Sequence, residues 1–209
     1  MINKERKLTE AELKRKEKFD KICDEMNNNG YVRTDLTVSV AKANIMAFIV
    51  MLPFEIILFI FYCIFVPIYE QTFYFKDCII LFILLFAFIV LHECIHGLTW
   101  GIFTENHLKS IDFGLIKKAL TPYCTCSEPL KKQQYILGTA MPTIILGFIP
   151  AVISICISSY LLFFLSMIMI FSGGGDFFII LKILMHNRRY KDAVYYDHPY
   201  ECGVVVFEK

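Results

Sequence analysis

Three polar side chains interrupt a long apolar stretch of this chain, where the sequence reads VLHECIHGL from Val90 to Leu98. Residues four apart in an α-helix share one face, roughly 5–6 Å apart, so His92 and His96 can both bind one metal ion. Glu93 lies beside them, where it can take a proton from a water on that metal. This is the H-E-x-x-H arrangement of zinc hydrolases. It predicts Zn²⁺ as cofactor, His92 and His96 as metal ligands and Glu93 as catalytic base.

A second interpretation of the same residues is a polar cluster that hydrogen-bonds neighbouring helices. Their apolar surroundings favour the metal site. A carboxylate at membrane depth costs at least ~2.5 kcal/mol, and ionisable groups there are retained mainly for function.

The composition indicates an integral membrane protein. The chain has 209 residues, of which 56% are hydrophobic, against roughly 45–50% in an average soluble protein. The excess is concentrated between residues 44 and 185, while both ends are polar. The net charge of +1 implies no dominant basic surface and argues against nucleic acid as a partner. We therefore expect an all-α membrane fold with soluble ends.

Four transmembrane helices are predicted, because a span needs ~20 apolar residues. They cover about residues 45–69, 78–103, 135–157 and 160–185, within a transmembrane domain of residues 44–185. The last apolar block is too long for one span and is divided near Ser158.

The polar ends are predicted to be cytoplasmic. Residues 1–43 contain a charged helix that Thr9 and Glu12 open as a capping box, lying either on the membrane surface or in solvent. Residues 186–209 form a C-terminal tail. Lys and Arg gather in the N-terminal segment, in residues 104–134 and after the last span. The positive-inside rule then gives a multi-pass protein of the cell membrane with both termini in the cytoplasm.

A β-hairpin is expected on the cytoplasmic side, between the second and third spans. The segment LKSIDFGLIKKALTPYCTCSEPL reads as two short strands around a turn, from its β-branched and aromatic content. The hairpin either caps the helix ends or dips into the membrane surface beside the metal site. Outside these segments, we expect His107, His186 and His198 at the surface, with Asp197–Pro199 forming a turn.

Catalytic zinc usually takes a third protein ligand. Asp176 lies about as deep in the fourth span as His92 and His96 lie in the second, given a rise of about 1.5 Å per residue. Glu55, in the first span, has a similar depth. Asp176 is preferred because three glycines precede it and let its backbone approach the helix of the two histidines closely. For Glu55 the simpler interpretation is a hydrogen bond at the kink of Pro53.

Four segments together resemble a known family: LHECIHGL, PLKKQQYILGTAMPTIILGFIP, SGGGDFFIILKIL and DHPYECG, in this order from about Val90 to Val205. They resemble the putative zincin peptidases of bacterial membranes, which are in turn similar to the site-two-protease class of intramembrane metalloproteases. The resemblance implies that His92, His96 and Asp176 bind the metal and that Glu93 is the base. Site-two proteases have Asp-Gly where Phe177 follows Asp176 here, so the resemblance leaves the substrate class open.

The predicted function is a zinc-dependent membrane-embedded peptidase. Its partners would be the lipid bilayer and a membrane protein or peptide substrate, whose peptide bonds it hydrolyses through a metal-activated water. One alternative is a non-catalytic metal-binding membrane protein, such as a sensor or transport accessory, which needs the ligands but not Glu93. Another is a protease-like scaffold that binds membrane helices without cutting them.

Overall fold

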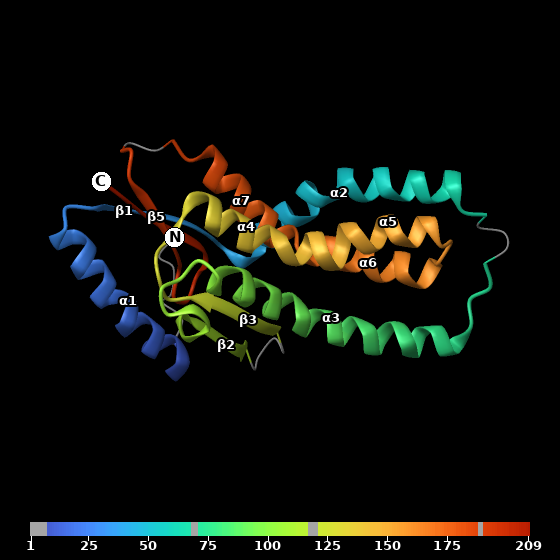
Figure 1. Cartoon of the computed structure of the whole chain (residues 1–209), viewed down its shortest axis with the longest axis horizontal. Helices are drawn as coiled ribbons and strands as arrows, with labels where there is room; N and C mark the ends of the chain where they lie inside the picture. Colours follow the sequence, from blue (N-terminus) through green and yellow to red (C-terminus); the bar gives the residue numbers. More distant parts are fainter. Residues whose placement is uncertain (1–7, 68–70, 117–120, 188–189) are drawn as a thin grey trace.

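The computed structural model describes residues 8–67, 71–116, 121–187 and 190–209. A bundle of apolar helices occupies one end of an elongated molecule, and a β-sheet with an N-terminal helix occupies the other (Figure 1). Helices of the bundle extend as far as the strands. Residues near the strand-facing ends of α3 and α4 therefore contact residues of the strands.

Three or four helical segments correspond in order to the four predicted spans. Three stretches within the described residues are long and apolar enough to cross a membrane: α2 (Val40–Phe65), α3 (Phe75–Gly101) and the continuous segment Lys132–Cys156. A bent pair, α6 (Tyr160–Ser172) and α7 (Gly174–Met185), passes the same test together with a 42° bend, which gives three or four spans. Residues 68 and 69, at the end of the first predicted span, lie outside the described residues.

The third span is not one regular helix. It consists of α4 (Lys132–Thr143), a π-helical turn η3 (Ile144–Phe148) and α5 (Ile149–Cys156). Pro142 and Pro150 flank the π-helical turn, and a proline lacks the N–H that a regular α-helical ladder requires. The irregularity follows from these two prolines.

The fold is mostly helical, as expected, but it is not all-α, because both polar ends contribute to a four-stranded antiparallel sheet. Its strand order is β1 (Val32–Val38), β6 (Cys202–Glu208), β5 (Ala193–Asp197) and β4 (Leu130–Lys131). The strand β1 pairs along its whole length with β6, so the C-terminal tail is the centre of a sheet and not a free end.

The run Val204–Phe207 explains why this strand forms. All four side chains are fully buried. Successive side chains of a strand point to opposite faces. Here Val204 and Val206 belong to the buried cluster that contains Trp100, while Val205 and Phe207 belong to the cluster that contains Phe19. A strand covered on both faces reads as a continuous apolar run.

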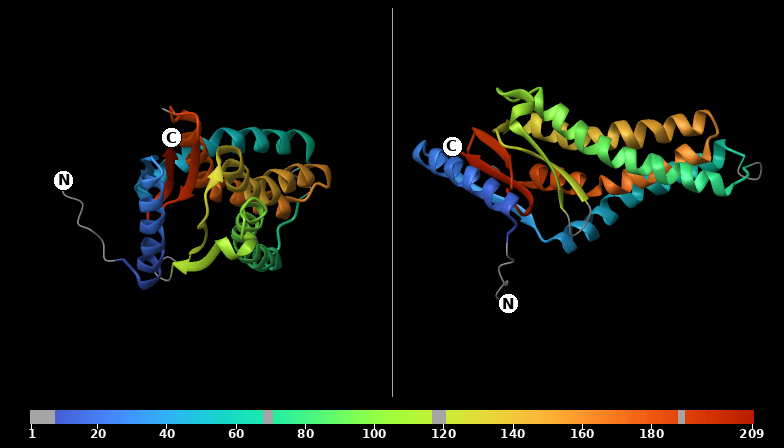
Figure 2. Two further views of the ribbon diagram at one scale, coloured as in Figure 1. Left: turned by 60° about the vertical axis from the view of Figure 1, so that its left-hand side comes forward. Right: turned by 90° about the horizontal axis from the view of Figure 1, so that it is seen from below.

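The N-terminal helix α1 (Glu10–Asn28) covers the outer face of this sheet (Figure 2). The predicted capping box of Thr9 and Glu12 is confirmed. The apolar stripe of α1, with Phe19 and Cys23 buried, packs against Tyr196 and Phe207. These two residues of α1 are therefore covered by the sheet and not by lipid or solvent.

A β-hairpin of β2 (Ile111–Ile116) and β3 (Thr121–Cys126) follows α3 after the short 3₁₀-helix η2 (His107–Ser110). It packs tightly on α3, since a Cβ built on Gly97 would lie 2.4 Å from Cζ of Phe113 and 2.8 Å from Cγ2 of Ile111. Gly97 follows His96 directly, so the hairpin lies beside the predicted metal ligands. Its cytoplasmic placement stays a prediction.

Glu128 holds the connection between α3 and the hairpin. Its carboxylate accepts hydrogen bonds from Ser110 Oγ at 2.5 Å, Asn106 Nδ2 at 2.7 Å and the Glu105 N–H at 2.8 Å. Partial burial works against ionisation, but these hydrogen bonds outweigh it and hold the pKa of Glu128 below its ordinary value. The carboxylate therefore stabilises the fold at neutral pH.

We expect Glu128→Gln to lower the free energy of unfolding by about 0.5–1 kcal/mol at pH 7, since the site is partly exposed. A carboxyl whose folded pKa is depressed contributes stability above its unfolded pKa, about 4.3, and loses it as the pH falls through the folded value. The melting temperatures of wild type and variant in detergent should thus differ at pH 7 and converge below about pH 4. A difference that persists unchanged at pH 3 would contradict this origin.

Candidate metal centre

The two histidines lie where α3 passes from the exposed part of its length into the interior of the protein. The buried residues of α3 are concentrated in its last ten positions, from His92 to Gly101. His92 and His96 are 8% and 5% exposed, and their Nε2 atoms lie 3.1 Å apart. The helical spacing of four residues thus brings both rings to one buried point, as the sequence predicts.

Asp176 reaches this point from α7, 84 residues away from His92 along the chain. Its Oδ2 atom lies 3.1 Å from Nε2 of His92 and 3.5 Å from Nε2 of His96. Within the described part of the chain, these three residues form the group able to hold a metal ion, and Glu55 is not a member of it. Asp176 is therefore brought together with the histidines and Glu55 is not.

The three donor atoms fit a zinc ion. Their separations of 3.1, 3.1 and 3.5 Å are those given above. Tetrahedral zinc with bonds of about 2.0–2.1 Å separates its ligand atoms by about 3.3–3.4 Å. Two imidazole nitrogens and one carboxylate oxygen also make a donor set that zinc takes in catalytic sites.

A hydrogen bond from the nitrogen that faces away from Asp176 fixes the orientation of the His96 ring. Its Nδ1 lies 2.8 Å from the carbonyl oxygen of Gly138 in α4. A carbonyl only accepts, so Nδ1 carries the hydrogen and Nε2 keeps its lone pair for a metal. Nδ1 of His92 is buried and has no hydrogen-bond partner among the described residues. Among the described residues, a hydrogen bond through Nδ1 thus orients the ring of His96 but not that of His92.

Trp100, one helical turn after His96, stacks on the face of the His96 ring. The two rings stack with centroids 5.1 Å apart and an angle of 17° between planes. The indole Nε1 donates to the carbonyl oxygen of Tyr135 at 3.2 Å. A Cβ built on Gly138 would lie 2.1 Å from the indole, so glycine is needed for this approach of α4 to α3.

Gly138→Ala should displace the Trp100 indole and, with it, the ring of His96. We expect a loss of about 1–3 kcal/mol in stability from overpacking, together with weaker zinc binding. Gly175→Ala is the matched control, because a Cβ at Gly175 has nothing within 4 Å. Thermal unfolding and zinc titration of both variants measure the effect. Equal behaviour of the two variants would contradict the close packing at Gly138.

Glu93 lies beside the ligands on α3, and its side chain is half-buried. The backbone N–H of Cys124 in β3 hydrogen-bonds its carboxylate. The hairpin therefore holds the predicted base in place. This contact joins a residue of the apolar helix to a strand that the sequence places in a separate loop.

The glycines before Asp176 act differently from the prediction. A Cβ on Gly173 would lie 1.8 Å from Oγ1 of Thr143 in α4, and one on Gly174 would lie 2.8 Å from Cβ of Ala47 in α2. They do allow close approach, but of α7 to α4 and α2 and not to the metal helix α3. Asp176 is thus positioned by the packing of three helices.

Several residues around the site were not predicted, namely Trp100, Tyr135, Gly138 and Asp197. Asp197 is the first residue of the segment DHPYECG, which reads locally as a turn and carries no sign of its distant partners. The chain bends at residues 199–201, later than the predicted turn, because Asp197 is still the last residue of β5, and the expectation of a surface His198 is wrong. His198 is buried, and its Nδ1 accepts the N–H of Glu201 at 2.9 Å.

Comparison with known proteins supports the resemblance seen in the sequence. A family model described as putative zincin peptidase matches residues 85–190. The matched range contains the H-E-x-x-H segment, the hairpin and Asp176. Neither the comparison with curated proteins nor that with solved structures gives a match. Because the matched range is just over half of the 209 residues, this chain belongs to the putative zincin peptidase family.

Proposed function

We propose that this protein is a zinc-dependent peptidase that hydrolyses membrane or membrane-associated proteins. One observation carries the proposal: Nε2 of His92, Nε2 of His96 and Oδ2 of Asp176 converge beside the carboxylate of Glu93. A metal-binding protein without catalysis has no need of a held carboxylate next to its ligands. The family description supports the same class of enzyme.

His92, His96 and Asp176 would hold the metal. When bound, zinc supplies Lewis acidity, which lowers the pKa of water toward ~7 and polarises a peptide carbonyl. Glu93 accepts the proton of the attacking water and passes it to the leaving amine. The Cys124 N–H hydrogen-bonds the Glu93 carboxylate, and the carbonyl oxygen of Gly138 keeps the lone pair of His96 on Nε2.

The membrane substrate is supported by the helices that carry the site. His92 and His96 lie on α3, and Asp176 lies in the bent pair α6–α7, both of which pass as membrane spans. A substrate helix has its backbone groups sequestered in its own ladder, so it must unwind locally before hydrolysis. We further propose, from the distribution of Lys and Arg, that the site opens toward the cytoplasmic side and that both termini are cytoplasmic.

The test maps new protein N-termini in membranes that contain the protein. Membranes are incubated as prepared, with a zinc chelator, and with chelator followed by added zinc. We expect a set of membrane-protein fragments that appears in the first sample, is lost in the second and returns in the third. Zinc bound at one ion per chain with no such fragments would favour the alternative, a non-catalytic metal-binding membrane protein.

A further inference from the structure

Strand β3 has two backbone amides held by carboxylates from other elements. In the pairing of β2 with β3, Ile111 faces Cys126 and Phe113 faces Cys124. The Cys126 N–H donates to Oδ2 of Asp197 at 2.8 Å, and the Cys124 N–H hydrogen-bonds the Glu93 carboxylate. Alternate residues of a strand present their backbone groups to the same edge. Asp197 and Glu93 therefore hold neighbouring positions on the edge of β3 that faces away from β2.

The other carboxylate oxygen of Asp197 is connected to His96 through two aromatic residues. Oδ1 accepts the hydroxyl of Tyr135 at 2.5 Å, and Tyr135 is fully buried. The carbonyl oxygen of Tyr135 accepts the indole N–H of Trp100 at 3.2 Å, and the indole stacks on His96. One carboxylate at the end of β5 is thus connected to the strand beside the base and to the ring that would bind the metal.

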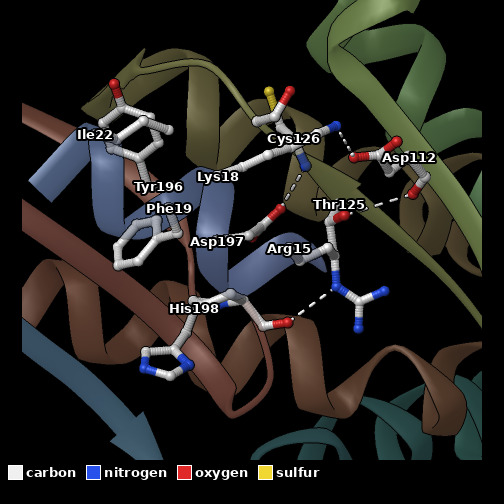
Figure 3. Close-up of a pocket in the computed structure, with 12 residues that line it drawn as sticks. Arg15, Lys18, Phe19, Ile22, Asp112, Thr125, Cys126, Tyr196, Asp197 and His198 are labelled. Carbon is white, nitrogen blue, oxygen red and sulfur yellow. Dashed lines mark hydrogen bonds and ion pairs between the residues drawn. The ribbon is translucent and has the colours of Figure 1, made fainter. Parts of the chain in front are cut away.

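The surroundings of Asp197 indicate a role beyond general stability. It lies at a cavity of about 30 Å³ between α1, the hairpin and the end of β5, and its carboxylate points toward Cys126 (Figure 3). Burial raises its pKa, while the hydrogen bonds from Tyr135 and Cys126 act in the opposite direction. Burying a carboxylate is costly even when it is hydrogen-bonded, and an apolar residue would avoid that penalty.

We propose that Asp197 is a positioning residue of the metallopeptidase site. Through its hydrogen bond to the Cys126 N–H it positions β3. It thereby also positions the Cys124 N–H, which hydrogen-bonds Glu93. Through Tyr135 and Trp100 it sets the orientation of the His96 ring. Asp197 itself touches neither metal nor substrate. The inference rests on the proposed function for its metal and its base, and extends the machinery beyond residues 85–190 to the C-terminal segment.

The test uses the full-length protein in detergent, with zinc alone as the probe. Asp197→Asn keeps an acceptor for Tyr135 but turns an amide toward the Cys126 N–H. We expect its zinc Kd, measured by competition with a chromophoric chelator, to rise about 10–100-fold, as for other residues that orient metal ligands. Trp100 is the single tryptophan of the chain, so its emission reports directly on the stack with His96.

Two further variants make the outcome decisive. Tyr135→Phe removes only the link to His96 and should raise the zinc Kd less, with the same change in Trp100 emission. Asp112→Asn is the control, because its carboxylate pairs with Lys18 at 3.6 Å on the exposed side of the hairpin. It should leave Kd and emission unchanged.

A purely structural role predicts that Asp197→Asn lowers the melting temperature but keeps the wild-type zinc Kd, and this result would overturn the proposal. Should Asp197→Asn fail to fold, a wild-type Kd and emission in Tyr135→Phe would overturn it instead. Wild-type protein that binds no zinc contradicts the proposed function. In that case unchanged Trp100 emission and Cys126 amide exchange in metal-free Asp197→Asn would contradict the positioning role.

Discussion

Glu93→Gln should abolish peptide hydrolysis while zinc stays bound. The substitution keeps the size of the side chain and an oxygen for the Cys124 N–H, but removes the group that takes up a proton. General bases contribute about 10²–10⁴-fold to rate, so we expect a loss of that size. The rate at which new N-termini appear in membranes measures it, beside the zinc content of the purified variant.

Glu105→Gln is the matched control for this prediction. Glu105 is exposed and lies in the turn after α3, where its backbone N–H and not its carboxylate makes the contact with Glu128. It should cleave at the wild-type rate. Wild-type cleavage by Glu93→Gln with zinc still bound would remove Glu93 from the chemistry. Loss of zinc in that variant would place Glu93 among the ligands instead.

Asp176→Ala is expected to weaken zinc binding more than any change outside the ligand set. Residues that only orient ligands contribute about 10–100-fold to metal affinity, so loss of a ligand should exceed ~100-fold. The remaining pair, His92 and His96, offers two donors where catalytic zinc usually has three. Metal analysis of the purified protein and chelator competition give the stoichiometry and the Kd.

Glu55→Ala is the control, since it also removes a carboxylate from an apolar helix but leaves the converging group intact. It should bind zinc as the wild type does. The reverse pattern, with zinc lost in Glu55→Ala and kept in Asp176→Ala, would restore Glu55 as the third ligand. Equal binding by both variants would mean that neither carboxylate is a ligand.

The convergence of His92, His96 and Asp176 could be predicted because the signals of these residues are local or nearly so. The spacing of His92 and His96 needs only the helical repeat, and Asp176 needs only a comparison of depths in the membrane. The sheet could not be predicted in the same way. Residues 32–38 pair with residues 202–208, which lie near the other end of the chain. The sequence of neither segment indicates which segment it pairs with. The apolar run Val204–Phe207 indicates a strand buried on both faces, but only once a sheet is expected.

The supports of the site were missed for a related reason. Asp197, Tyr135 and Trp100 belong to a strand and two different helices, and their hydrogen bonds exist only after these elements pack. A tyrosine or tryptophan in an apolar helix reads as ordinary core. The similarity to site-two proteases stays a prediction, and the family match alone carries the assignment.

The pairing of β1 with β6 constrains how the polypeptide threads the bilayer. The strand β1 precedes α2 and β6 follows α7, and their backbones are hydrogen-bonded from Val32↔Glu208 to Val38↔Cys202. Two segments joined in this way occupy one compartment, so the number of crossings between them must be even. Three crossings would leave the strands on opposite faces. Of the counts of three and four that helix length allows, four, with the bent pair α6–α7 as the last span, is therefore the one consistent with this pairing.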